Sequence, residues 1–370
     1  MTDNKDTLAT TPLHALHVEL GGRMVPFAGY DMPVQYPDGI MSEHLHCRSA
    51  AGLFDVSHMG QVRVKGKDVR QAVETLLPAD LVNSEAGRMH YSFLLNDKGG
   101  ILDDLMVTPF EDHVFMVLNA ACKQSDIAHL KARLPAGCEV IEEDDKALLA
   151  LQGPEAANVL SALAPDVAEM RFMTMRDLDI AGVPCRISRS GYTGEDGYEI
   201  SVPGAQADAF ARKLLADARV KPIGLGARDS LRLEAGLCLY GHDIDETTTP
   251  IEAALTWAVA KSRREAGGFP GDSIILKQIA EKTPQRRVGL IGEGRAPVRE
   301  GAELVNDAGE VIGKVTSGSY GPSAEAPVAM GYLPRELSEP GTKVKALVRG
   351  RERPMTVAKM PFVEHRYYRG

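Results

Sequence analysis

The sequence predicts a multi-domain α+β protein whose C-terminal part is an all-β barrel. At 370 residues the chain is too long for one ordinary hydrophobic core, so two or three domains are expected. Between about residues 61 and 141 the hydrophobic pattern follows the order strand, helix, strand, strand, helix, strand, which is typical of a ferredoxin-like α+β unit. From residue 285 onward, short strands follow one another at nearly regular spacing, which predicts a barrel or sandwich.

Composition describes a soluble globular chain, with 44% hydrophobic and 25% charged residues. The net charge of -9 argues against broad nucleic-acid binding, because that needs dense Lys and Arg to replace phosphate counterions. No run approaches the roughly 18 apolar residues of a membrane-spanning helix, and residues 1–10 are polar, unlike an export signal. The cysteines are odd in number and never form a C-x-x-C pair, so neither disulfides nor a zinc ribbon is expected. They suit a reducing compartment, which predicts a cytoplasmic location.

Two short helices are expected near the start, at residues 11–20 and 41–51. The segment between them, residues 24–36, is rich in aromatic residues, Met and Pro and is expected to be irregular. The second helix contains His44 and His46. Spacing of two residues places their imidazoles on different sides of a helix, so no metal site is expected there.

Residues 91–108 are expected to form a hairpin, because two apolar runs flank the turn Asn-Asp-Lys-Gly-Gly. Since side chains alternate along a strand, Asp103 and Asp104 must point to opposite faces, each among apolar neighbours. A buried carboxylate is costly unless it is paired or hydrogen-bonded. The pattern leaves two roles open for these residues, capping of a nearby loop amide or participation in a site.

The stretch from Ser190 to Ser201, with sequence SGYTGEDGYEIS, is the most distinctive of the chain. Its three glycines permit a tight turn with positive φ, and strands are expected on both sides, so the stretch predicts a wide hairpin. Alternation on the second strand places Glu199 opposite the apolar Tyr198 and Ile200. Acidic turns are usually solvated surface connections, so this stretch alone does not establish a site.

Two further helices are expected downstream. One is expected over residues 224–240, where two glycines stand at the start and Arg228 lies in the first turn. The stretch lacks the third glycine of a dinucleotide-binding fingerprint, so such a site is not expected. Residues 249–252 form a capping box that predicts a helix over residues 250–264, which carries the only tryptophan, Trp257. Basic residues at the C-terminal end of that helix interact favourably with the helix dipole. The alternative is that they form a docking patch for an acidic partner.

No nucleophile motif of a hydrolase or metalloprotease is present. The chain instead offers carboxylate, aromatic and arginine side chains on loops. Such a set suits a ligand with a flat, nitrogen-rich ring, because a carboxylate accepts adjacent N–H donors, aromatic rings cover the apolar faces, and Arg pairs with an anionic tail.

Several long motifs follow one another along the whole chain. They are residues 54–59 (FDVSHM), 99–104 (GGILDD), 190–200 (SGYTGEDGYEI), 227–241 (ARDSLRLEAGLCLYG) and 359–363 (KMPFV). Together they resemble the aminomethyltransferases, the T-protein family of the glycine cleavage system. The resemblance implies a folate-binding α+β domain of residues 1–55 and 146–280, a ferredoxin-like domain of residues 56–145, and a C-terminal β-barrel domain of residues 285–370, around a central hole.

The resemblance also implies a reaction. Tetrahydrofolate would be the acceptor, and an aminomethyl group on the dihydrolipoyl arm of H-protein would be the donor. The products would be 5,10-methylenetetrahydrofolate, ammonia and dihydrolipoyl H-protein. Such a reaction needs no covalent enzyme nucleophile and no metal; it needs positioning and a carboxylate that handles charge and protons at the folate nitrogens. A monomer or weak dimer is expected, with no nucleic-acid or membrane partner.

Matching the family motifs residue by residue assigns the catalytic role to Asp104 rather than Asp103. Glu199 matches the acceptor for the pterin edge, Tyr192 lines the same pocket, and Arg228 matches a folate or substrate contact. Further pocket residues by the same resemblance are Met59, Tyr91, Asn119 and Trp257, with Tyr367 as a looser match.

The chain departs from the family pattern at two places, and relatives of other kinds exist. Tyr30 stands where the family often has Trp, and residues 319–323 (SYGPS) replace a more usual TFSPT, which concerns the pocket wall. The alternative activity is a tetrahydrofolate-dependent demethylase of an N-methyl or sulfonium substrate. A folate-binding protein of iron–sulfur maintenance is disfavoured, because its Lys-Gly-Cys motif is absent.

Overall fold

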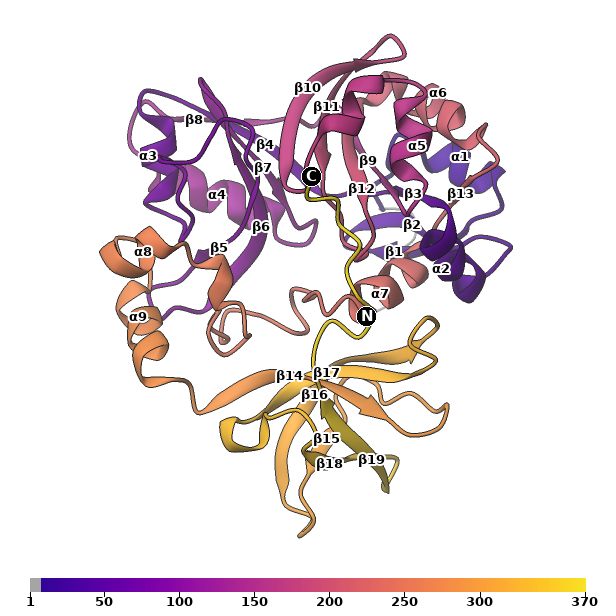
Figure 1. Ribbon diagram of the computed structural model, residues 1–370. Coiled ribbons are helices and arrows are strands. Elements are labelled where there is room, and N and C mark those ends of the chain that lie inside the picture. Colours follow the sequence, from indigo (N-terminus) through magenta and orange to yellow (C-terminus); the bar gives the residue numbers. More distant parts are fainter. Residues whose placement is uncertain (1–7) are drawn as a thin grey trace.

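The computed structural model describes residues 8–370 and confirms the predicted class, an α+β chain with a closed C-terminal barrel. A five-stranded and a six-stranded sheet lie side by side, and the barrel lies below them (Figure 1). Residues 1–7, part of the polar segment noted above, lie outside the described residues. None of the helices in residues 8–370 combines the length and apolar character needed to cross a bilayer.

The six-stranded sheet has the order β10-β11-β12-β9-β3-β13 and is antiparallel except where β13 pairs with β3. Its helices cover one face; α6, for example, buries Ala207, Phe210, Ala211 and Leu214 on one side. The sequence did not predict three of its strands, which are β3, β10 and β13. The elements are α1 (His14–Glu19), β3 (Ala51–Asp55), β9 (Lys146–Gln152), α5 (Ala156–Ser161), the 3-10 helix Pro165–Glu169, β10 (Thr174–Ile180), β11 (Val183–Arg189), β12 (Gly197–Pro203), α6 (Gly204–Leu215) and β13 (Val220–Pro222).

The five-stranded sheet has the order β5-β6-β7-β4-β8 and is antiparallel throughout. Three consecutive strands separate its helices, one more than the ferredoxin-like order contains; the third is the buried run His113–Leu118. The elements are β4 (Gly60–Lys65), α3 (Val69–Glu74), β5 (His90–Leu95), β6 (Ile101–Pro109), β7 (His113–Leu118), α4 (Lys123–Arg133) and β8 (Glu139–Glu142).

The barrel closes in the order β14-β17-β16-β15-β18-β19, as the regular spacing of short strands predicts. Its core is aliphatic and includes Leu290, Leu304, Val315 and Ala346. The elements are β14 (Gln285–Gly292), β15 (Glu303–Val305), β16 (Val311–Gly321), β17 (Ala326–Pro334), the 3-10 helix Arg335–Leu337, β18 (Lys343–Val348) and β19 (Arg351–Ala358). The domain bounds given above stay a prediction.

The segment predicted to be irregular forms a small hairpin of β1 (Arg23–Phe27) and β2 (Tyr30–Gln35). A two-stranded sheet tolerates Pro26 and Pro33, since neither strand must donate on both sides. The first two helices are otherwise near their predicted places, with α2 at Ile40–Ser49.

The helix predicted over residues 250–264 is wrong, although its capping box forms. Thr249 Oγ1 accepts from Glu252 N at 3.2 Å, and Thr249 N donates to the Glu252 carboxylate at 3.0 Å. The chain then turns because Ala254 has φ 59°, so only the 3-10 helix Thr256–Ala258 and α8 (Lys261–Ala266) follow, with α9 (Asp272–Glu281) after them. Similarly, α7 (Leu225–Glu234) ends earlier than predicted, since Gly236 has φ 69°.

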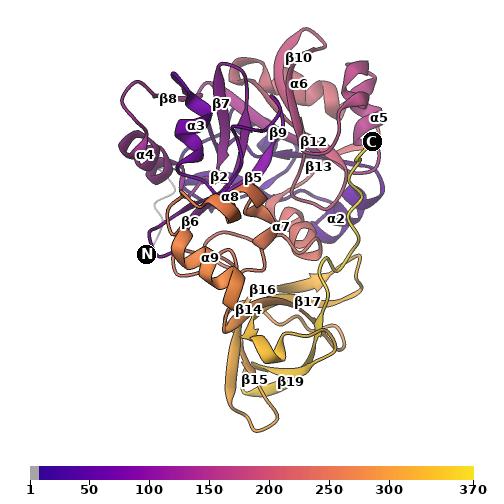
Figure 2. The same cartoon turned by 60° about the vertical axis from the view of Figure 1, so that its left-hand side comes forward.

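The C-terminal segment returns from the barrel to the six-stranded sheet, as both views show (Figures 1 and 2). Phe172 N donates to the Tyr368 carbonyl at 2.8 Å. The cysteines in residues 8–370 are free; Cys47, Cys122, Cys185 and Cys238 are buried and Cys138 is partly exposed.

Candidate active site

Asp104 lies on the partly buried face of β6, and Asp103 points the other way into the core, as alternation predicts. Tyr91 donates its hydroxyl to Asp104 Oδ2 at 2.8 Å, and Asn119 Nδ2 donates to Asp104 Oδ1 at 2.8 Å. The Tyr91 ring is stacked on Trp257 with centroids 5.5 Å apart. The structure therefore brings Asp104, Tyr91, Asn119 and Trp257 into one cluster.

Asn119 also joins the two faces of β6. Its amide nitrogen donates to Asp103 Oδ1 at 2.9 Å, and its backbone N–H donates to Asp103 Oδ2 at 3.2 Å. Burial raises the pKa of Asp103, and burial together with the charge of Asp103 raises the pKa of Asp126 to about 9. A proton therefore remains on this buried carboxylate pair at neutral pH.

The pKa of Asp104 is raised from its ordinary value of 3.8 to about 7, first by burial and then by the charge of Asp103. The hydrogen bonds from Tyr91 and Asn119 oppose this shift. A carboxyl group with such a pKa can exchange a proton near neutral pH, which is the property expected of a catalytic acid or base.

This shift predicts a pH-dependent cost in stability. The folded protein holds the Asp104 proton more tightly than the unfolded chain, so the free energy of unfolding falls as pH rises from about 4 to about 7 and then levels off. Asp104→Asn removes that cost. We expect the Tm of Asp104→Asn to exceed that of the wild type by a few degrees at about pH 8, and by less at about pH 5.

Asp97→Asn is the matched control for thermal unfolding, because Asp97 is an exposed carboxylate in the turn of the same hairpin. The difference in Tm between Asp97→Asn and the wild type should be the same at each pH. A Tm difference between Asp104→Asn and wild type that shrinks toward high pH would contradict the raised pKa.

A second cluster surrounds Glu199 on β12. Ser190 donates its hydroxyl to Glu199 Oε2 at 3.3 Å. The guanidinium of Arg228 lies 4.5 Å above the centre of the Tyr192 ring. Burial raises the pKa of Glu199, and the charge of Arg228 opposes that rise. The Tyr192 hydroxyl donates to the carbonyl of Cys238, which fixes the direction of the ring.

Glu199, Tyr192 and Arg228 line a narrow cavity. Its free volume is about 10 Å³, room for about one water molecule. A flat ring can therefore enter this cavity only if a lining side chain moves, and the Arg228 guanidinium covers the face of Tyr192. The lining residues are Phe54, Val56, Ala150, Gln152, Tyr192, Thr193, Glu199 and Arg228.

Tyr192 connects the two clusters. Asp104 does not line the cavity. Burial is the main cause that raises the pKa of Tyr192, the charge of Arg228 opposes the rise, and the charge of Asp104 adds a smaller rise. The pKa of Tyr91 is raised by burial, by Asp104 and, more weakly, by Tyr192. Tyr192 therefore shares the cavity with Glu199 and lies within range of the charge of Asp104.

Two predicted pocket residues lie elsewhere. Met59 is not among the lining residues but packs against the apolar cluster that contains two of them, Phe54 and Val56. Tyr367 stacks on Phe172 at 3.9 Å between centroids, within the C-terminal segment, and the structure does not place it in either cluster.

The structure also places the other polar groups considered above. No cluster of His, Cys, Asp and Glu suited to a metal exists in residues 8–370, and His44 contacts Ser230 and Glu234 instead. Among the basic residues of α8, Arg263 pairs with Glu74 at 3.4 Å. The side chain of Lys261 is 90% exposed, so these basic residues do not share one environment.

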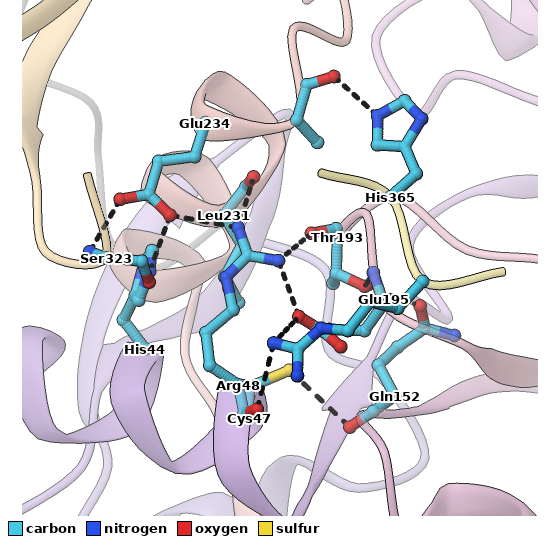
Figure 3. Close-up of polar contacts among 12 residues, drawn as sticks. His44, Cys47, Arg48, Gln152, Thr193, Glu195, Leu231, Glu234, Ser323 and His365 are labelled. Carbon is cyan, nitrogen blue, oxygen red and sulfur yellow. Dashed lines mark hydrogen bonds and ion pairs between the residues drawn. The ribbon is translucent and has the colours of Figure 1, made fainter. Parts of the chain in front are cut away.

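Sequence reasoning missed Arg48 of α2, which is buried and contacts Glu195 and Glu234 (Figure 3). It also missed Gln152, which supports the glycine-rich loop. A side chain at position 191 would place its Cβ 1.8 Å from Gln152 Oε1, so Gly191 is required by this contact. The sequence shows Gly191 but does not reveal that Gln152 is its neighbour in the fold.

Comparison with known proteins gives the same family over the whole chain. The family model described as GCVT N-terminal domain matches residues 13–263, and the model described as glycine cleavage T-protein C-terminal barrel domain matches residues 285–364. Mitochondrial aminomethyltransferase of Dictyostelium discoideum is 46% identical, covering 98% of this chain and 94% of the relative. The mouse (Mus musculus) mitochondrial aminomethyltransferase is 47% identical, covering 98% and 92%.

A solved structure agrees. The crystal structure of glycine cleavage system aminomethyltransferase T from Bartonella henselae superposes with a TM-score of 0.94 at 46% identity, covering 98% of this chain and 99% of that one. The resemblance of the motifs is confirmed.

Proposed function

This chain belongs to the aminomethyltransferase, or T-protein, family of the glycine cleavage system, and we propose that it transfers the methylene of the aminomethyl group on dihydrolipoyl H-protein to tetrahydrofolate. The products are 5,10-methylenetetrahydrofolate, ammonia and dihydrolipoyl H-protein. The observation that supports this proposal most is that Tyr192 lines one cavity with Glu199 and feels the charge of Asp104, within a fold shared along its length with an aminomethyltransferase.

The residues around the cavity fit a reduced pterin. Within residues 8–370 the Glu199 carboxylate accepts one hydrogen bond, from Ser190, so acceptor sites remain for the N–H groups of a pterin edge. Tyr192 offers a flat face to the ring. Displacement of the Arg228 guanidinium from that face opens the cavity and frees its charge for the anionic tail of the folate.

Tetrahydrofolate supplies the nitrogens that take up the methylene. Glu199 and Tyr192 hold the ring so that the reacting nitrogen faces Asp104, which converts an encounter of two molecules into a reaction within one complex. Asp104, in its ionised form, stabilises positive charge at the folate nitrogen and accepts the proton released on ring closure. Tyr91 and Asn119 fix the orientation of the carboxylate through their hydrogen bonds.

The pH dependence of the rate follows from the pKa of Asp104. Because the ionised carboxylate is the active form, kcat should rise with pH and reach half of its plateau near the pKa of about 7. The measurement is kcat for ammonia release between about pH 5 and pH 9 at saturating folate. If kcat fell as pH rises, or did not change near pH 7, the ionised carboxylate of Asp104 would not be the active form.

The test of the function is ammonia release from aminomethylated H-protein. Turnover should require tetrahydrofolate, the loaded H-protein and the enzyme together, and omission of the folate should abolish rapid release. One-carbon transfer from an N-methyl or sulfonium compound without H-protein, in place of this reaction, would identify the alternative demethylase instead.

The aminomethyltransferases of Dictyostelium discoideum and mouse are mitochondrial. For this chain a cytoplasmic location, and a monomeric or weakly dimeric state, stay predictions.

A further inference from the structure

Glu195, in the loop between β11 and β12, is a buried carboxylate on which two guanidinium groups converge. Its side chain is 0% exposed. Arg48 Nη1 contacts Oε1 at 2.8 Å from α2, and Arg366 Nη2 contacts the same oxygen at 2.6 Å from the C-terminal segment. An acidic residue that the sequence suggested to be part of a solvated turn is thus neutralised from two distant parts of the chain.

The same two arginines also hold the backbone of the loop. Arg48 Nη1 donates to the Thr193 carbonyl at 2.8 Å, and the backbone N–H of Arg366 donates to the Gly194 carbonyl at 2.8 Å. The Thr193 hydroxyl donates to Gln152 Oε1 at 2.8 Å. Residues 193–195 are therefore fixed from three sides, by α2, by β9 and by the C-terminal segment.

This loop forms part of the cavity wall. Thr193 and Gln152 both line the cavity, and Tyr192 is the adjacent residue that carries the stacking face. A shift of the backbone at Thr193 would move the Tyr192 ring relative to Glu199. The position of the ring thus depends on contacts made by Glu195, which is not itself a lining residue.

Glu234 of α7 extends this network to the barrel, as Figure 3 shows. Its Oε2 accepts from Arg48 Nη2 at 3.0 Å, and its Oε1 accepts from the backbone N–H of Ser323, in the barrel, at 2.7 Å. Its carbonyl accepts from Phe362 N at 2.8 Å. Arg48 and Glu234 thereby form a buried ion pair that joins α2, α7 and the barrel. The C-terminal segment adds Arg366 to this network.

The two arginines differ in exposure. The side chain of Arg48 is 6% exposed, whereas that of Arg366 is 48% exposed. Removal of Arg48 would leave Glu195 and Glu234 short of a buried cation, which is strongly destabilising. Removal of Arg366 leaves Arg48 to neutralise Glu195 and creates no internal void, so its effect on the loop can be separated from an effect on folding.

We propose that the Arg366 side chain is a positioning group for the folate site, which it serves by holding residues 193–195 through its ion pair with Glu195; the bond from its backbone N–H to the Gly194 carbonyl remains in any variant. The proposal rests on the function stated above, because it assumes that tetrahydrofolate binds at the Tyr192 and Glu199 cavity. Arg366 touches no reacting atom. It raises the fraction of molecules in which the cavity wall is in place before folate arrives.

The test compares Arg366→Met with wild type. If the loop is correctly placed in about a tenth of the variant molecules, the Kd for tetrahydrofolate rises about tenfold. KM for tetrahydrofolate should rise in parallel, and kcat at saturating folate should stay within about twofold, since bound folate restores the loop. Kd is measured by calorimetry and the Tm of each variant is recorded.

Lys359→Gln is the matched control. Lys359 is an exposed cation of the same segment that makes no hydrogen bond or ion pair with the rest of residues 8–370, so its loss should leave Kd, KM and kcat unchanged. Arg366→Lys keeps the charge but not the planar fork, and should give a Kd between those of wild type and Arg366→Met.

An unchanged Kd in Arg366→Met, or a fall in kcat with KM unchanged, would overturn the positioning role. Should Arg366→Met fail to fold, the Lys variant decides, because a wild-type Kd there overturns the proposal. Absence of folate binding by the wild type would instead overturn the proposed function and the inference with it, so the two failures are distinguishable.

Discussion

Asp104→Asn is expected to lower kcat for ammonia release by roughly 10²–10⁴-fold, the range typical of a lost acid–base group. The amide is nearly isosteric and retains an acceptor for Tyr91 or Asn119, but it cannot carry the negative charge that stabilises the reacting folate nitrogen. The Kd for tetrahydrofolate should change by less than about threefold, because the positive charge that Asp104 stabilises develops at the folate nitrogen only during the reaction. Single-turnover rates and calorimetric Kd values separate these quantities.

Asp97→Asn is also the control for the rate of Asp104→Asn. It removes an exposed carboxylate from the same hairpin and leaves the cluster around Asp104 unchanged. Its kcat should equal that of wild type. Should Asp104→Asn retain the wild-type rate, or lose folate affinity and rate in equal proportion, the catalytic role would have to move to another group.

Glu199→Gln is expected to produce the opposite pattern, with folate affinity as the main loss. Hydrogen bonds to a charged acceptor contribute up to about 3 kcal/mol, so a loss of about 2–3 kcal/mol raises the Kd about 30- to 150-fold. The Gln amide also presents donors to the N–H groups of the pterin edge, which adds repulsion. Calorimetry with tetrahydrofolate measures the change, and kcat at saturation should fall much less than in Asp104→Asn.

The control for Glu199 is Asp208→Asn, which removes a half-exposed carboxylate of α6, the helix that packs on the same sheet. It should bind folate as wild type does. A Kd for Glu199→Gln within about threefold of the wild-type value would mean that another group accepts the pterin N–H donors.

Local patterns predicted the parts of the site that depend on one strand or one turn. Alternation separated Asp103 from Asp104 and placed Glu199 opposite Tyr198, as the structure confirms. The capping box at Thr249 forms as predicted. The helix predicted after it is wrong, because Ala254 adopts a left-handed conformation that propensity does not reveal.

Contacts between distant residues were beyond such reasoning. Glu195 meets Arg48 and Arg366 across sequence separations of 147 and 171 residues, and no local period relates such positions. The sequence therefore suggested a solvated acidic turn where the structure has a buried ion cluster. The raised pKa of Asp104 likewise depends on burial produced by the assembled chain and on Asp103, which alternation alone could only place on the other face.

The burial of most thiols has a consequence for redox chemistry. The reactive form of a cysteine is the thiolate, and burial raises the pKa of Cys47, Cys185 and Cys238 to about 12, so almost none is present at neutral pH. Peroxide and alkylating agents therefore reach these sulfurs only when the surrounding structure opens. Since the Cys238 carbonyl accepts from Tyr192, one of these unreactive thiols belongs to a residue that directly supports the cavity wall.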